Sequence, residues 1–109
     1  MAYTNTHRAA KISPTKAMSV MAMIRGKSVE QALTELLLSK KRAAVLIRQS
    51  LRAAIANADQ AEVDVRRLVV TDARVDQGPI IKRWQPKDRG RAHPIWKRTS
   101  HLLVAVDEK

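Results

Sequence analysis

The stretch GPIIKRWQPKDRGRAHPIWKRTS, residues 78–100, separates two strand-like segments and decides the architecture expected of this chain. It is too long for an ordinary hairpin loop and too short to fold as a domain. Between Lys82 and Arg98 it contains seven Lys or Arg residues, one acid and almost no aliphatic side chain. Such a segment has little with which to pack on a core, so we expect a basic arm that projects from a folded body.

The sequence of this arm is symmetric about Gly90, which predicts a two-stranded β-hairpin that turns there. In that register Trp84 faces Trp96, Pro86 faces Pro94, and the like-charged pairs are Arg89 with Arg91, Lys82 with Arg98 and Arg83 with Lys97. The tryptophan pair is expected to clamp the strands, with stacking on splayed nucleic-acid bases as the alternative. Proline has no N–H to donate, so regular pairing is expected to end at the two prolines and leave an open tip.

The arm is expected to need a partner, because like charges that face each other across two strands destabilise a free hairpin. At about 3.3 Å per residue, the segment from Gly78 to Gly90 spans on the order of 40 Å. This length exceeds what a surface groove requires. It suits insertion into a folded RNA.

Three helices are expected before the arm. Ser13-Pro14 begins the first helix and Gly26 ends it, since Ser is a good N-cap, Pro fits the first turn and Gly fits a helix stop. The capping box Ser28–Gln31 begins the second helix, and Ser39 caps a third over roughly Lys40 to Ala58. The apolar positions expected to be buried are Ala17, Val20, Met21 and Ile24, then Val29, Ala32, Leu33, Leu36 and Leu37, then Ala43, Ala44, Leu46, Ile47, Leu51, Ala54, Ile55 and Ala58.

Strands are expected on both sides of the arm. In the run from Arg67 to Val75, the apolar residues Val69, Ala73 and Val75 alternate with charged ones, and His101 to Val106 is almost continuously aliphatic. A short strand is also expected around Ala9 to Ile12. The fold class is therefore α+β, with three helices packed on a small antiparallel sheet and a long protruding β-hairpin. We expect a single domain over residues 1–109, with the arm at 78–100.

The charge of the chain indicates a polyanionic partner. Twenty-one Lys and Arg against ten Asp and Glu give a net charge of +11, with no acid before Glu30 and none between Glu35 and Asp59. Nucleic acid is the partner that such a bias favours over a surface kept basic for solubility. A membrane surface would require a basic amphipathic helix with Trp or Phe on its apolar face, and the chain has no Phe. On the third helix, Lys41, Arg48 and Arg52 share one face, which is either solvated or bound to phosphate.

No enzymatic or metal chemistry is indicated. The chain has no Cys, and His7, His93 and His101 lack a partner at helical spacing, so we expect no metal and no cofactor. Phosphate-loop, dinucleotide and metalloprotease motifs are absent. Asp72 and Asp76 are explained by pairing with Arg74 on the same strand. We expect a cytoplasmic protein that is not an enzyme.

Several motifs taken together resemble bacterial large-subunit ribosomal protein twenty-two. They occur in the same order over nearly the whole chain, and they are Ile12-Ser13-Pro14-Thr15-Lys16, Ile24-Arg25-Gly26-Lys27-Ser28-Val29-Glu30-Gln31-Ala32-Leu33, Ala54-Ile55-Ala56-Asn57-Ala58, Val75-Asp76-Gln77-Gly78-Pro79, Arg89-Gly90-Arg91-Ala92 and Lys97-Arg98-Thr99-Ser100-His101. The resemblance implies a structural constituent of the large ribosomal subunit. It would bind large-subunit rRNA, assist early assembly, and line the nascent-peptide exit tunnel near the macrolide-binding region with its hairpin.

The resemblance also implies partners and binding residues. The partners would be rRNA, neighbouring ribosomal proteins and the nascent polypeptide, with no membrane and no homo-oligomer; a free architectural protein that inserts a basic β-arm into nucleic acid is the alternative. The tip that lines the tunnel would be Lys87, Asp88, Arg89, Gly90, Arg91 and Ala92. The rRNA-binding residues would be Arg8, Lys11, Lys16, Arg25, Lys27, Lys82, Arg83, Trp84, Lys87, Arg89, Arg91, Trp96, Lys97, Arg98, Ser100 and His101. Gln77, Pro94 and the two tryptophans depart from the residues common in the family, which concerns the shape of the tip.

Overall fold

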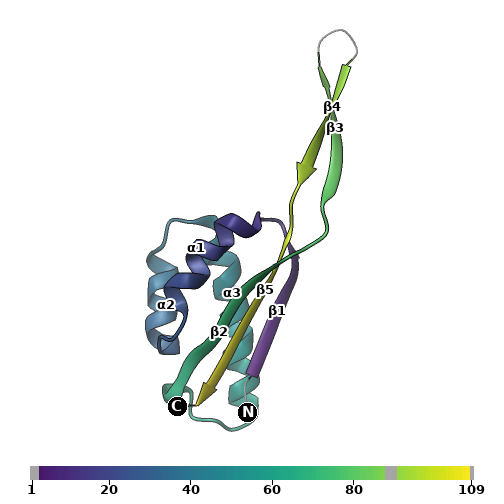
Figure 1. The fold of residues 1–109 in the computed structure, drawn as a ribbon. Helices are drawn as coiled ribbons and strands as arrows, with labels where there is room; N and C mark the ends of the chain where they lie inside the picture. The colour runs from purple at the N-terminus through teal and green to yellow at the C-terminus, as the bar shows by residue number, and fades with distance from the viewer. Residues whose placement is uncertain (1–2, 88–90, 109) are drawn as a thin grey trace.

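A three-stranded antiparallel sheet carries the helices on one face, and a two-stranded ribbon extends from one end of it (Figure 1). The computed structural model of the chain describes residues 3–87 and 91–108, with side chains described for 3–82 and 97–108. The sheet has the order β1 (Tyr3–Ala10), β5 (Ser100–Glu108), β2 (Leu68–Gln77), and the ribbon pairs β3 (Ile81–Lys87) with β4 (Arg91–Lys97). The expected α+β class with a protruding hairpin is confirmed.

The three helices begin close to the residues that the sequence indicates. They are α1 (Pro14–Ile24), α2 (Val29–Leu38) and α3 (Arg42–Gln60), and a short 3-10 turn, η1 (Val65–Arg67), precedes β2. The Ser28 hydroxyl accepts the Gln31 N–H at 3.4 Å, as expected of a cap. Ser39 caps the end of α2 instead of beginning the third helix, which starts two residues later than predicted.

The core lies between the helices and one face of the sheet. Val20, Met21 and Ile24 of α1 are fully buried there, and Leu102, Val104 and Val106 of β5 alternate inward to meet the helices. The predicted apolar stripes of α1 and α3 are confirmed, with Leu46 and Ile55 partly buried at the edge of the core. On α2 the prediction was wrong for Leu37, which is 65% exposed.

Strand β1 is longer and earlier than the sequence predicts. It covers Tyr3–Ala10 rather than Ala9 to Ile12, because pairing with the central strand β5 and hydrogen bonds from α3 hold a segment with few apolar residues. The Ser50 hydroxyl donates to Asn5 Oδ1 at 2.9 Å, and the Asn57 amide donates to the Thr4 carbonyl at 3.1 Å. Polar contacts therefore replace the hydrophobic pattern that would have announced this strand.

A β-bulge in β2 changes which of its residues face the core. The register with β5 shifts between Val70 and Asp72, so Leu68, Val70 and Ala73 are buried while Val69 is only partly buried. The strict alternation predicted from Val69 was therefore wrong for the first half of the strand. The outer edge of β2 is covered by the α1–α2 connection, where the Gly26 N–H donates to the Val70 carbonyl at 2.9 Å.

The strands of the arm pair in a different register from the predicted one. Trp84 lies opposite Pro94, and Trp96 lies opposite Lys82. The predicted facing pairs Trp84–Trp96, Pro86–Pro94, Lys82–Arg98 and Arg83–Lys97 are therefore wrong by two residues. The observed register places Arg83 opposite Ile95 and Lys82 opposite a tryptophan, so cations no longer face each other at the base of the arm.

Regular pairing continues past both prolines to Lys87 and Arg91, so the predicted open tip bounded by Pro86 and Pro94 is wrong. Every second backbone N of a two-stranded ribbon points away from its partner strand, and a proline there costs no ladder hydrogen bond. Both prolines have the same parity in the observed register, so both can stand at outward positions. The predicted Arg89–Arg91 pair lies outside the described residues.

The arm makes the molecule elongated. The described residues extend over 62 × 24 × 16 Å, and their radius of gyration is 16.8 Å, against about 13 Å for a compact domain of this length. Figure 1 shows β3 and β4 continuing beyond the helices in the direction of β2 and β5. The ribbon thus has the long reach that its sequence implied.

Candidate nucleic-acid interface

The arm joins the body through a tightly packed root. The Gly78 N–H donates to the Thr99 carbonyl at 2.9 Å, and the Thr99 hydroxyl donates to the Pro79 carbonyl. Beside it, the buried Ser100 hydroxyl donates to the Ile12 carbonyl at 2.7 Å, which fixes the segment between β1 and α1. The root therefore positions the Lys and Arg residues of the arm base relative to those of the body.

Three adjoining cavities of about 380, 380 and 340 Å³ lie next to this root, and Arg42 at the start of α3 lines all of them. The β1–α1 segment, the first turns of α1 and α3, and the returning strand of the arm form their walls. We call this surface the root groove and define it by its six cations: Lys11, Lys16, Lys41, Arg42, Lys97 and Arg98.

The root groove is strongly positive. Its lining contains no Asp or Glu, and among the described residues none of its six cations forms an ion pair. All six are exposed to solvent. By contrast, a fourth cavity at the other end of β2 has Asp107 and Glu108 in its wall. Positive charge is therefore concentrated on the side of the body from which the arm leaves.

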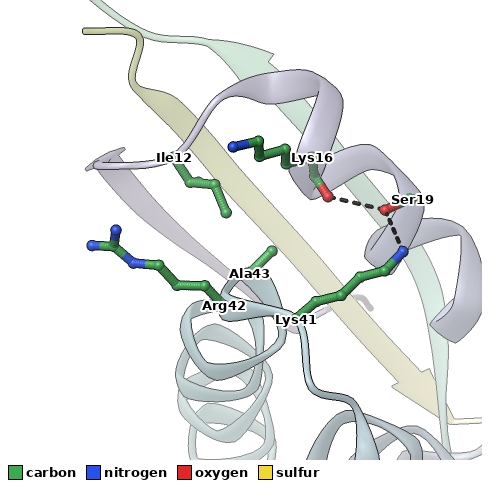
Figure 2. Close-up of a pocket in the computed structure, with 6 residues that line it drawn as sticks. All are labelled: Ile12, Lys16, Ser19, Lys41, Arg42 and Ala43. Carbon is green, nitrogen blue, oxygen red and sulfur yellow. Dashed lines mark hydrogen bonds between the residues drawn. The ribbon is translucent and has the colours of Figure 1, made fainter.

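Figure 2 shows how one of the three cavities is built. Lys16 extends from α1 and Arg42 from α3, with the apolar side chains of Ile12 and Ala43 between these two walls. The Lys41 ammonium donates to the Ser19 hydroxyl at 3.0 Å. Ser19 in turn donates to the Lys16 carbonyl at 3.0 Å. Neutral oxygens hold Lys41 in place without cancelling its charge.

The residues predicted to bind rRNA divide into three groups. Lys11, Lys16, Lys97 and Arg98 come together in the root groove, while Arg8 on β1 and Lys82 on β3 are exposed outside it. A second group has partners inside the protein: Arg25 donates to the Ala73 carbonyl at 2.7 Å, and Lys27 forms a salt bridge with Glu35 at 2.5 Å. The Lys27 charge is thus already compensated.

Ser100 and His101 also have internal roles. The Ser100 side chain is fully buried, so the structure does not present it to a nucleic acid. His101 Nδ1 accepts the Ala9 N–H at 3.0 Å, beside the irregular pairing of β1 with β5. Both positions were selected because they belong to a motif, and both serve to join strands at the root.

The third group cannot be placed. The side chains of Arg83, Trp84, Lys87, Arg91, Ala92 and Trp96, and the whole of Asp88, Arg89 and Gly90, lie outside the described residues. The predicted tip therefore remains a prediction. So does base stacking by the tryptophans.

Arg42 was missed at the sequence level, although it connects the whole groove. The sequence does contain an indication of it, since Lys40, Lys41 and Arg42 stand together at the start of a helix. Cations are unfavourable at the positive end of a helix dipole, so such a cluster points to a role other than helix stability. Of the helix face predicted from Lys41, Arg48 and Arg52, Arg48 is half-buried and only Lys41 lines the groove.

Other kinds of site find no support in the described part of the chain. Residues 3–87 and 91–108 contain no group of three His, Cys, Asp or Glu side chains that could hold a metal ion. Within the same residues, no helix has both the length and the apolar character that a bilayer crossing requires. The Arg74–Asp76 ion pair, at 3.8 Å, accounts for one of the two strand acids as expected.

Comparison with known proteins identifies the family. A model of the family described as ribosomal protein L22p/L17e matches residues 5–107. The chain belongs to this family. It is 42% identical over 102 residues to the large ribosomal subunit protein uL22 of Hydrogenobaculum sp. (strain Y04AAS1), an alignment that covers 94% of this chain and 84% of the relative. It is also 52% identical over 97 residues to uL22 of Magnetococcus marinus (strain ATCC BAA-1437 / JCM 17883 / MC-1), covering 88% and 86%.

A third relative, uL22 of Desulfosudis oleivorans (strain DSM 6200 / JCM 39069 / Hxd3), is 44% identical over 104 residues, with 95% of this chain and 91% of the relative covered. Membership of the L22p/L17e family makes the chain a structural constituent of the large ribosomal subunit and not an enzyme. It also places the chain on the ribosome in the bacterial cytoplasm. The alternative of a free architectural nucleic-acid binder is thereby disfavoured.

Proposed function

We propose that this ribosomal protein binds large-subunit rRNA, assists early subunit assembly, and lines the nascent-peptide exit tunnel near the macrolide-binding region with its arm. The observation that supports this most directly is the two-stranded ribbon β3–β4. It carries a dense basic sequence away from a body that already has its own core. Its partners would be rRNA, neighbouring ribosomal proteins and the nascent chain, with no second copy of itself.

Charge supplies the driving force for the rRNA contact. With a net charge of +11, the chain gains free energy when Lys and Arg displace counterions from phosphates, a term that weakens steeply with salt. A narrow ribbon without a hydrophobic core of its own is well suited to pass between RNA helices. Contacts to phosphates would position it there without reading sequence.

The test is a variant that lacks Gln85–Ile95, produced in a strain whose only copy of the gene is altered. Removing the distal part of the arm leaves the root and the body sheet intact, so we expect subunits that still contain the protein. We also expect altered macrolide sensitivity or altered arrest by stalling peptides. A matched variant, Lys87→Gln with Arg91→Gln, keeps the ribbon and removes two charges. Unaltered tunnel properties in the shortened variant would refute the tunnel-lining role.

A further inference from the structure

The root groove has no charge compensation of its own. Its six cations come from three separate segments: the β1–α1 connection with α1, the start of α3, and the end of β4 with the residues that follow it. Each segment is fixed locally, by the Ser100–Ile12 and Gly78–Thr99 hydrogen bonds at the root. Like charges are thus held close together by the fold, at a cost that a bound anion would remove.

The lining of the groove indicates which part of a nucleic acid would bind. Between the cations lie Ile12, Ala43 and Ile81, and the lining contains no aromatic residue on which a base could stack. It also has no Asn, Gln, Asp or Glu side chain with which to read base edges. What it offers is Lys, Arg and a few hydroxyl groups, which are donors suited to phosphate oxygens.

We propose that the root groove binds a run of consecutive RNA phosphates and that Arg42 is its central ligand. This inference rests on the proposed function, because the RNA would be the large-subunit rRNA. Arg42 borders all three cavities, and its guanidinium can bind one phosphate with two parallel hydrogen bonds. The site is separate from the distal arm and belongs to the body.

The groove also connects the arm to the body. One of its cavities is lined by Lys11 and Arg42 of the body together with Lys97 and Arg98 at the base of the arm. A phosphate run that neutralises both sets holds the arm in one direction. The same RNA would then serve as the anchor that orients the ribbon for insertion.

The experiment measures binding of the full chain to a transcribed large-subunit rRNA over a range of salt concentrations. Arg42→Gln is compared with Arg66→Gln, an equal charge change at an exposed residue of η1, at the far end of β2 from the arm. We expect Arg42→Gln to weaken binding roughly tenfold and to lower the salt slope by about one, with Arg66→Gln close to the parent. Arg42→Lys should fall between them, because it keeps the charge and loses the two-pronged geometry.

Two further arms keep the result decisive. The Arg42→Gln loss should persist in a chain that lacks Gln85–Ile95, so failure of the tunnel role leaves this test unaffected. Circular dichroism should show an unchanged melting temperature, since Arg42 is exposed. Equal affinities for Arg42→Gln and Arg66→Gln would overturn the proposal. It would also be overturned if Arg42→Gln abolished binding of a polyglutamate peptide and left rRNA binding intact, because the groove would then be a protein-docking site.

Discussion

At the scale of single residues, the contact of Gly78 with Thr99 controls the root of the arm. A Cβ added at Gly78 would lie 2.6 Å from Thr99 Oγ1 and 3.2 Å from the Thr99 carbonyl carbon. Because backbone cannot move as a flexible side chain can, we expect Gly78→Ala to lower the free energy of unfolding by about 1–3 kcal/mol. Urea denaturation followed by circular dichroism measures this. A loss below about 0.5 kcal/mol would show that the root is loosely packed.

Gly26 provides the contrast, because its requirement for glycine has another cause. Nothing lies within 4 Å of a Cβ placed there, but its φ is +75°, in the left-handed region. We expect Gly26→Ala to cost about 1–2 kcal/mol, and Gly26→Asn to recover part of that loss, since Asn tolerates this conformation. Gly78→Asn should recover nothing. The same unfolding measurement distinguishes the two causes.

Ser100 separates a structural role from a binding role. Its buried hydroxyl donates to the Ile12 carbonyl, and Ser100→Ala would leave that carbonyl without this donor. We expect a loss of about 1–3 kcal/mol in unfolding free energy, with rRNA affinity nearly unchanged below the melting temperature. Ser19→Ala, at an exposed position, is the control for stability and should change it by less than about 0.5 kcal/mol. Weaker rRNA binding without a stability loss would restore the binding role predicted for Ser100.

At the scale of elements, the register of the arm makes the sharpest prediction. In the observed pairing Gln85 lies opposite His93, whereas a turn centred on Gly90 would place it opposite Ile95. Since the chain has no Cys, a pair of introduced cysteines reports on the register alone. Gln85→Cys with His93→Cys should oxidise readily to a disulfide, because directly opposed strand residues have suitable Cα separations.

The control is Gln85→Cys with Ile95→Cys, which should form a disulfide slowly or not at all. Mass spectrometry of the oxidised chain measures both. Faster cross-linking of the Ile95 pair would show that the symmetric register, with Trp84 facing Trp96, is the one adopted in solution.

Elements with local chemistry of their own could be predicted from the sequence. Ser13-Pro14 and Ser28 with Gln31 place two helix starts because the cap depends on neighbouring residues only. Strand β1 could not be located in the same way, since its polar residues pair with β5, far away in the chain. The bulge near Val70 and the arm register depend likewise on partner strands. Within the candidate site, Lys11, Lys16, Lys97 and Arg98 were predicted from motifs, but their convergence on Arg42 is a property of the fold.

At the scale of the whole molecule, two basic features divide the task of binding RNA. The body offers the root groove, and the arm extends a basic ribbon beyond it, so that the described residues extend over 62 Å. The groove accounts for anchoring and the ribbon for reach. This division explains why a small body with a thin core bears a net charge of +11 that only a polyanion can balance.

Cross-linking in assembled ribosomes tests the central claim most directly. A photoreactive amino acid in place of Arg91 is activated in ribosomes that hold a stalled, radiolabelled nascent chain, with the same amino acid in place of Arg66 as the control. The account predicts a cross-link between position 91 and the nascent chain, and none from position 66. Incorporation into large subunits with no cross-link from position 91 would contradict it, because the arm would then end outside the tunnel.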